Sequence, residues 1–127
     1  MQTTFYEKDK LLIFTINEEI DECSVKDIRR RADYEIERFM PREVIFDFDS
    51  VSFMDSAGIG MIIGRYKQVQ MLGGKTEVTN LSQSVEKILK MSGVLKIIPI
   101  IDLEERMEKI VSNEKEVINL WKIMRWN

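Results

Sequence analysis

Apolar positions recur along this chain in two alternating patterns, one typical of β-strands and the other of amphipathic helices. Five short segments read as strands, and the run around Asp47 is apolar on both faces, which indicates a central strand. The last segment contains Pro99, which restricts it to an edge or an end of the sheet. The expected strands are 3–6, 11–16, 44–48, 75–80 and 95–100, of which the first two form a β-hairpin.

Four other segments have helical periodicity. Ser24 is expected to cap the first, with Asp27 placed to complete an acidic capping box. In the second helix Gly60 and Gly64 lie four residues apart, and we expect them to leave a shallow groove for close packing. The expected helices are 24–40 (ended by Pro41), 56–72, a short one from 82 or 84 to 91, and a long amphipathic C-terminal helix at about 102–126.

Length and composition indicate one soluble, globular domain spanning 1–127. The chain has 127 residues, of which 44% are apolar and 32% charged. No apolar run is long enough to span a bilayer, and the single Cys23 fits a reducing compartment. The net charge of −3 is a poor match for a phosphate backbone. We therefore expect a cytoplasmic location, no membrane association and no direct contact with nucleic acid.

The sequence contains no histidine, which excludes Ser-His-Asp and Cys-His catalysis as well as histidine zinc sites. The nearest Ser-x-x-Lys match, Ser112 to Lys115, lies inside an expected helix, so serine hydrolase chemistry is not expected. The acidic loop Glu18–Glu22 has four carboxylates in five residues but lacks spaced ligands and a turn glycine. We expect no metal and no cofactor there, and interpret it as a solvated loop or a contact for a basic partner.

The segment Phe53–Gly60 connects the central strand to the second helix, and it is the main candidate site. Asp55 or Ser56 is suited to cap that helix, and the spacing fits this structural role as well as a functional one. In the functional interpretation, the N–H groups and the helix dipole favour a phosphate on or near Ser56. Gly58 and Gly60 would keep the surface low for an approaching protein. The glycine spacing does not fit a nucleotide-binding loop.

The stretch Val51–Gln68 resembles the signature of the anti-sigma factor antagonists, which are STAS domains. Within that family the likeness is greatest to the antagonist of the sporulation anti-sigma F factor, and Leu72–Gly74 and Met91–Ile98 support it. The resemblance covers about 5–115. It implies an α/β STAS fold, with a mixed sheet of about five strands, helices packed on it and an extended C-terminal helix.

The resemblance also implies a role in sigma factor regulation by partner switching. In that family the unphosphorylated protein binds an anti-sigma factor that is also an ATP-dependent serine kinase, and so releases the sigma factor for transcription. Phosphorylation of the serine in the Asp-Ser motif, here Ser56, blocks binding, and a PP2C-type phosphatase restores it. The antagonist is then a substrate and a ligand, not an enzyme. The implied partner-binding residues are Glu19, Asp21, Asp55, Ser56, Ala57, Gly58 and Ile59.

The chain departs from the family pattern in three places. Glu18–Asp21 replaces the usual Gly-Glu-Leu-Asp and loses its glycine, and Ala57 stands where the sporulation antagonist has a second serine. The C-terminus extends past the family's usual end, where Trp121 and Trp126 either complete the core or anchor a partner or a second copy. We expect a monomer or weak dimer. An unswitched STAS scaffold and a small-ligand or nucleotide-binding STAS module remain as alternatives.

Overall fold

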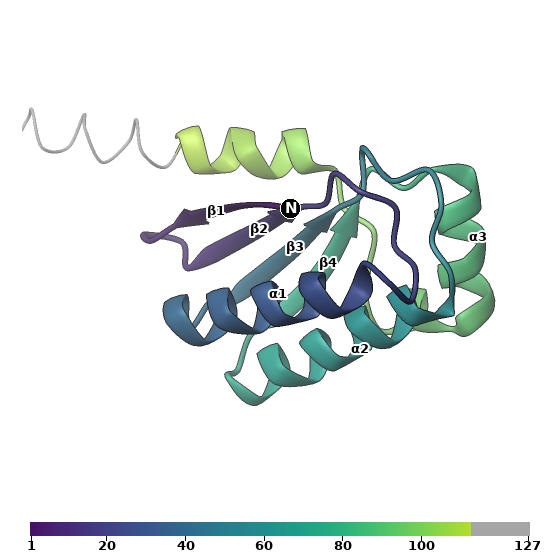
Figure 1. Ribbon diagram of the computed structural model, residues 1–127. Coiled ribbons are helices and arrows are strands. Elements are labelled where there is room, and N and C mark those ends of the chain that lie inside the picture. The colour runs from purple at the N-terminus through teal and green to yellow at the C-terminus, as the bar shows by residue number, and fades with distance from the viewer. Residues whose placement is uncertain (113–127) are drawn as a thin grey trace, which may run out of the picture.

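The computed structural model describes residues 1–112 and has a mixed sheet with helices on both faces (Figure 1). Strands and helices alternate as the sequence pattern predicts. None of the helices in this part of the chain has both the length and the apolar character needed to cross a membrane. In chain order the elements are β1 (Gln2–Tyr6), β2 (Leu11–Thr15), α1 (Val25–Phe39), β3 (Glu43–Asp47), α2 (Ser56–Met71), β4 (Lys75–Thr79), α3 (Gln83–Ser92), the 3-10 helix η1 (Val94–Lys96) and helical residues 103–112.

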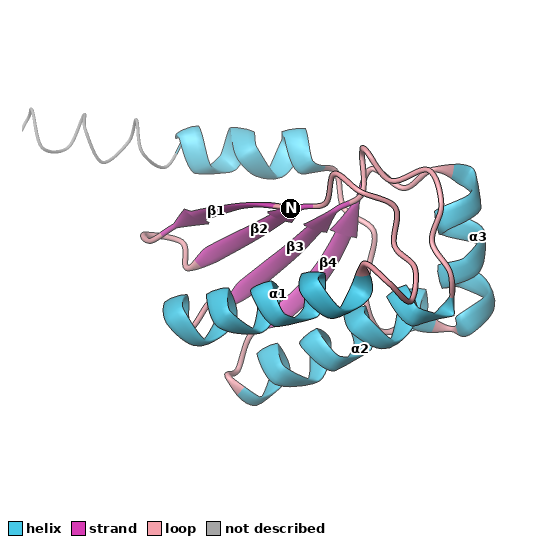
Figure 2. Cartoon of the chain, viewed as in Figure 1, coloured by secondary structure: helices cyan, strands magenta, loops and turns pink. Residues whose placement is uncertain are grey.

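The strands lie in the order β1-β2-β3-β4, with β1 antiparallel to β2 and the other pairs parallel. All five residues of β3 are buried, which confirms it as a central strand. Because β2, β3 and β4 are parallel, their carboxyl ends share one end of the sheet. The connections that leave these ends lie together there (Figure 2). In open α/β sheets this is the end at which binding sites form.

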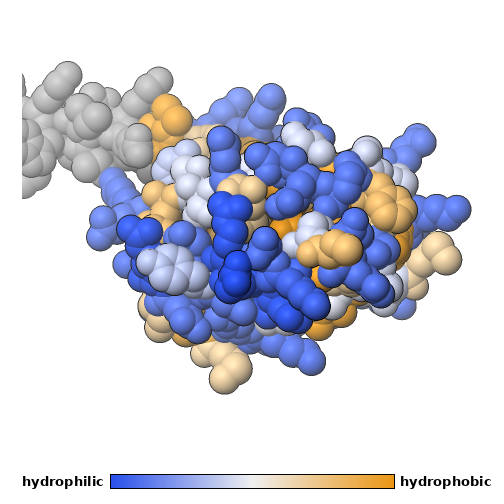
Figure 3. All heavy atoms as spheres, in the orientation of Figure 1, coloured by the Kyte–Doolittle hydropathy of each residue, from blue (hydrophilic) through white to orange (hydrophobic). Residues whose placement is uncertain are grey.

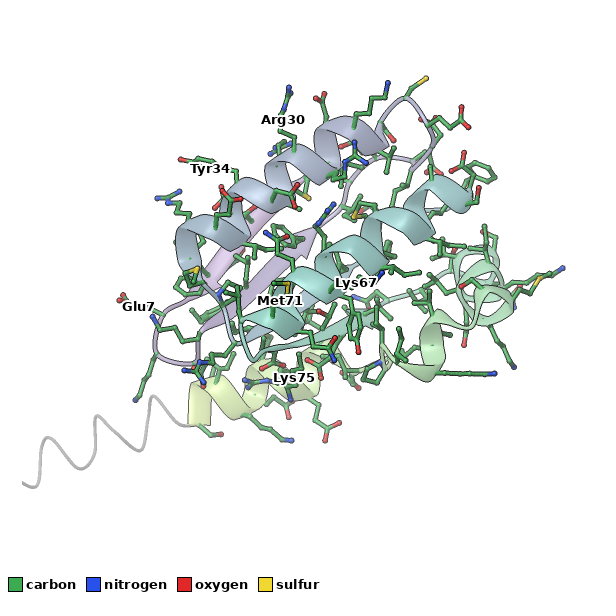
Figure 4. All side chains as sticks on the ribbon, turned by 90° about the horizontal axis from the view of Figure 1, so that it is seen from below. Glu7, Arg30, Tyr34, Lys67, Met71 and Lys75 are labelled. Carbon is green, nitrogen blue, oxygen red and sulfur yellow. The ribbon has the colours of Figure 1, made fainter. Side chains whose placement is uncertain are left out.

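The first face of the sheet is covered by α1 and α2, which lie side by side (Figures 1 and 4). Ile28, Ala32 and Ile36 of α1 are buried on it, as their spacing predicts. A short ion pair links the two helices, with 2.9 Å between Arg65 Nε and Asp33 Oδ1. This face holds most of the core, whose largest fully buried side chains are Leu12, Phe14, Ile16, Ile20, Ile28, Ile36, Phe46, Phe48, Ile62 and Leu89.

The second face carries a smaller apolar cluster under helical residues 103–112 (Figure 1). Ile110 is 1% exposed and packs there with Leu11, Ile13 and Ile45. The predicted C-terminal helix is therefore confirmed as far as residue 112. The rest of that prediction, including both tryptophans, lies outside the described residues.

The predicted fifth strand at 95–100 is wrong over most of its length. Gly93 has a φ of +82°, and the chain after it winds into η1 instead of extending. Only Ile100 pairs with the sheet, through a parallel bridge to Val78. The Val78 N–H donates to the Pro99 carbonyl at 3.0 Å, a bond that does not need the N–H that proline lacks. The described part of the sheet thus has four strands and one isolated bridge.

The predicted capping box of α1 is also wrong. Ser24 precedes the helix, but its side chain makes no capping hydrogen bond. Its hydroxyl instead donates to the Glu19 carbonyl at 2.7 Å, and Asp27 pairs with Arg30 at 2.6 Å. The neighbouring acidic loop competes for the Ser24 hydroxyl, and this contact is not visible in the local sequence.

The glycines of α2 do not serve the packing role predicted for them. A Cβ added at Gly60 or Gly64 would meet no atom within 4 Å, so neither glycine allows a close helix contact. Gly58 is the tightly packed one, since a Cβ there would overlap the Met54 side chain and lie 3.0 Å from Ile20. The requirement for glycine therefore lies at the first turn of the helix, next to the candidate site.

This difference predicts opposite effects of two alanine substitutions in α2. Gly58→Ala should destabilise the fold by about 1–3 kcal/mol, because Met54 is buried and must shift to admit the new methyl group. Gly64→Ala should stabilise it by about 0.5–1 kcal/mol, because alanine costs less backbone entropy in a helix. Urea unfolding followed by circular dichroism measures both. Equal effects of the two substitutions would contradict the packing described here.

Candidate functional site

Ser56 is the first residue of α2 and its side chain is exposed. The helix is capped by the residue before it, since Asp55 is extended (φ −98°, ψ −173°) and its Oδ1 accepts a hydrogen bond from the Ala57 N–H at 2.8 Å. Within residues 1–112 no protein group hydrogen-bonds the Ser56 hydroxyl. Of the two capping candidates, Asp55 therefore takes the structural role and Ser56 is left free.

The amide groups at the start of α2 are already partly used. The Ala57 N–H is bound by the Asp55 side chain, and the Gly58 N–H donates to the Asp55 carbonyl at 3.1 Å. A phosphate on Ser56 would consequently find fewer free amides than the sequence alone suggests. The positive end of the helix dipole remains, and no acidic residue lies in the first turn.

A single β-bridge joins the two loops that form this site. Ile20 pairs in parallel with Met54: the Ile20 N–H donates to the Phe53 carbonyl at 3.3 Å and the Asp55 N–H donates to the Ile20 carbonyl at 3.1 Å. Gly58 packs directly against the bridge. The acidic loop 18–22 is thereby held beside the start of α2, although more than 30 residues separate them in the chain.

Glu19 and Asp21 both have partners inside the protein. The Asp21 Oδ1 accepts hydrogen bonds from the N–H groups of Ser24 (2.9 Å) and Cys23 (2.8 Å), which lower the pKa of Asp21. The side-chain hydroxyl and then the N–H of Ser52 lower the pKa of Glu19 by donating to its Oε1 at 2.9 and 3.2 Å. Both carboxylates are thus held ionised and fixed in place at the rim of the site.

The contact from Glu19 extends to a third element. The Ser52 carbonyl accepts a hydrogen bond of 2.5 Å from the hydroxyl of Ser84, in the first turn of α3. Loops 18–22 and 50–55 and the start of α3 are therefore linked through one residue. Sequence reasoning missed Ser52 and Ser84, since neither carries a local signal for a contact across more than 30 positions.

Two shallow grooves flank the start of α2. One, of about 420 Å³, runs between α2 and α3 and is largely apolar; the other, of about 480 Å³, lies towards α1. Phe53 and Met91 line the first and are 55% and 78% exposed. Hydrophobic residues lie among hydrophilic ones at the end of the molecule that α3 occupies (Figure 3). The first groove is lined by Phe53, Ser56, Ile59, Lys87, Ile88 and Met91, and the second by Glu22, Cys23, Val25, Lys26, Arg29 and Ala57.

The residues expected at the site divide into surface and supporting positions. Ser56 is exposed, Asp55, Ala57 and Ile59 are half-buried, and Gly58 is buried. The idea that Gly58 itself forms a low docking surface is therefore wrong, because its bare backbone faces Met54 and the interior. Within residues 1–112, no three acidic or thiol side chains converge to hold a metal ion.

This chain belongs to the STAS domain family, which matches residues 2–116. It is similar to anti-sigma factor antagonists: it is 35% identical over 94 residues to the anti-sigma F factor antagonist of Paenibacillus polymyxa, an alignment that covers 74% of this chain and 80% of the relative. It is also 38% identical over 50 residues to the anti-sigma-B factor antagonist of Bacillus subtilis, covering 39% of this chain and 46% of that one. The resemblance stated from 51–68 is confirmed.

Solved structures agree on the fold. The anti-sigma factor antagonist SpoIIAA in its unphosphorylated form matches with a TM-score of 0.74 and 25% identity, covering 87% of this chain and 96% of that one. The phosphorylated form of the Bacillus cell fate determinant SpoIIAA matches with a TM-score of 0.67 and the same identity, covering 86% and 97%. The α/β STAS fold and membership of the anti-sigma factor antagonist family are therefore both shown.

The Glu19 contact generates a prediction for this site. In a Ser52→Ala variant the hydroxyl donor is lost, so the pKa of Glu19 should rise towards its usual 4.5, while the pKa of Asp21 should stay low. Because the pKa of Glu19 is lowered in the folded protein, the stabilisation is present above that usual value and is lost as the pH falls. A carboxyl ¹³C NMR titration measures both groups. An unchanged pKa of Glu19 would mean that Ser52 does not hold it.

Proposed function

We propose that this protein is an antagonist of an anti-sigma factor and that phosphorylation of Ser56 switches its binding off. The observation that carries the proposal is the Ser56 hydroxyl, which is exposed at the start of α2 and has no partner within residues 1–112, in a member of this family. One of the similar proteins, SpoIIAA, has been solved in unphosphorylated and phosphorylated forms. The proposal gives Ser56 the same two states.

In the unphosphorylated state the anti-sigma factor docks over the start of α2, and its sigma factor is released. The apolar groove beside Ser56, between Phe53 and Met91, offers the kind of surface that a protein partner buries. Ala57 and Ile59 are half-buried beside it and add contact area. Glu19 and Asp21 supply fixed negative charge at the rim, which suits a basic region of the partner.

A phosphoryl group on Ser56 opposes this docking for two physical reasons. It adds roughly −1.5 to −2 charges beside Asp55, whose carboxylate already caps the helix. It would also have to lose its hydration in an interface whose nearest groove is apolar. The N–H groups of Ala57 and Gly58 already donate to Asp55. They are therefore not free to hydrogen-bond the phosphate and hold it against the protein surface.

The remaining parts of the cycle belong to partners. The bound anti-sigma factor acts as the serine kinase and transfers the phosphoryl group from ATP, and a PP2C-type phosphatase removes it. This chain takes part as substrate and ligand and contributes no cofactor. Its cellular place in the proposal is the cytoplasm, where the sigma factor and the kinase operate.

The position of the modification is open to direct test. Incubation with an anti-sigma factor kinase of the kind proposed here, together with ATP, should place one phosphate on Ser56, as mapped by mass spectrometry. Ser56→Ala should take up none. Ser52→Ala is the matched control for position: it removes a nearby hydroxyl that is engaged with Glu19, and its phosphate should still map to Ser56. Phosphate on Ser52, or none on Ser56, would overturn the assignment.

The effect of charge can be separated from the loss of the hydroxyl. Ser56→Ala should bind the anti-sigma factor about as tightly as the unmodified protein, whereas Ser56→Asp should bind at least about tenfold more weakly, because a charge must be desolvated at the interface. Isothermal titration calorimetry with each variant gives the two dissociation constants. Equal affinities would show that charge at this position does not control docking.

A further inference from the structure

The second face of the sheet buries two carboxylic acids under helical residues 103–112. Glu43 on β3 and Glu77 on β4 are 5% and 7% exposed. In the parallel register Glu43 lies opposite Lys75, and Glu77 lies opposite Ile45 two residues further along. The two acids are therefore diagonal neighbours on one face. This cluster is remote from the Ser56 site and plays no part in the function proposed above.

The two acids have unequal partners. Arg106, on the covering helix, donates to both oxygens of Glu43, with Nη2 2.9 Å from Oε1 and Nε 3.2 Å from Oε2. Among the described residues Glu77 has one ion-pair partner, Lys75, whose Nζ is 3.9 Å from its Oε2, and the Glu77 Oε1 is buried with no hydrogen-bond partner there. Lys75 lies towards the covering helix (Figure 4). The cluster lines an open cavity of about 480 Å³. The charged residues Asp102, Glu105 and Lys109 line the same cavity.

Protonation of Glu77 makes the burial of these two neighbouring acids more favourable. A protonated Glu77 can donate to Glu43, whereas two ionised acids would repel each other and leave a charged oxygen without a partner. Burial, then the hydrogen bond and charge of Glu43, raises the pKa of Glu77 to about 7, against the opposing charges of Lys75 and Arg106. Burial alone would raise the pKa of Glu43 too, but hydrogen bonds from Glu77 and Arg106 outweigh it and lower that pKa.

We propose that Glu77 is a proton-operated latch, which holds helical residues 103–112 closed over the sheet while it is protonated and lets them separate more readily once it ionises. Separation gives the buried Oε1 of the ionised carboxylate the contact with water that it lacks in the closed state. Arg106 opposes opening in both states, because its bond to Glu43 does not depend on Glu77. The charge of Asp9, on the β1–β2 hairpin, also acts on Arg106.

The direction and size of the effect follow from proton linkage. The closed state has the raised pKa of about 7, and in the opened state Glu77 regains its usual pKa of 4.5. Stabilisation of the closed state is therefore complete below pH 4.5 and is lost as the pH rises to about 7 and beyond. Between about pH 6 and pH 8 these two values make opening about tenfold more favourable.

Hydrogen–deuterium exchange of the full chain tests the latch. After correction for intrinsic exchange rates, protection of the 103–112 amides should fall about tenfold from about pH 6 to pH 8. Glu77→Gln keeps a neutral hydrogen-bond donor and should make this protection independent of pH. Glu108→Gln is the matched control, since it removes an exposed carboxylate from the same helix and should keep the original dependence.

Two results would overturn the proposal. The first is a Glu77→Gln variant whose 103–112 amides respond to pH as strongly as those of the unchanged protein. The second is an equal loss of protection in α1 and α2, which would mean that the whole fold weakens and that the helix is not released separately.

Discussion

The site depends on one contact, the bridge between Ile20 and Met54. These residues lie in loops that leave different strands, and their two backbone hydrogen bonds, with distances of 3.3 and 3.1 Å, fix the loops side by side. Gly58 can start its helical turn against them only because it has no side chain. Without this bridge, Asp55 would have no defined position from which to cap α2, and the acidic loop would have no fixed relation to Ser56.

The surroundings of the bridge make the site a rigid platform. Glu19 bonds to Ser52, which bonds in turn to Ser84 on α3, so the loops are connected to both helices that border the apolar groove. A phosphoryl group added at Ser56 therefore changes the charge of a surface whose shape is already determined. Charge is a suitable signal here, because the Ser56 side chain, the proposed site of modification, has no bond within residues 1–112 that must first be broken.

The two faces of the sheet have different physical characters. The first is almost wholly apolar and is packed by α1 and α2, whereas the second combines a small apolar cluster with the Glu43–Glu77 pair. Stability of the first face should depend little on pH near neutrality. The second face contains a carboxyl group whose pKa is raised to about 7, and this is why we propose that the helix over it responds to acidity.

Local sequence signals predict most of the helices and strands and the position of Ser56 between a strand and a helix. The hydrogen bonds that shape the site are non-local and are not predicted by these signals. The strand before 56 and the helix after it were read from periodicity, and Asp55 was one of two suitable caps. Three features depend on strand register and loop pairing across 33 or more positions: the choice of Asp55 as the cap, the Glu19–Ser52 hydrogen bond and the Glu43–Glu77 pair. The predicted fifth strand is wrong because the chain after Gly93, whose φ is +82°, winds into η1, and the periodicity of so short an apolar segment does not distinguish such a turn from a strand.

In the proposed function, one phosphoryl group on Ser56 decides whether the anti-sigma factor can bind. The most direct measurement compares the affinity of the anti-sigma factor for the unmodified chain and for the chain carrying phosphoserine at position 56 alone. A stable complex should form with the first, and no complex should be detectable with the second at the same concentration. Equal affinity for the two forms would contradict it.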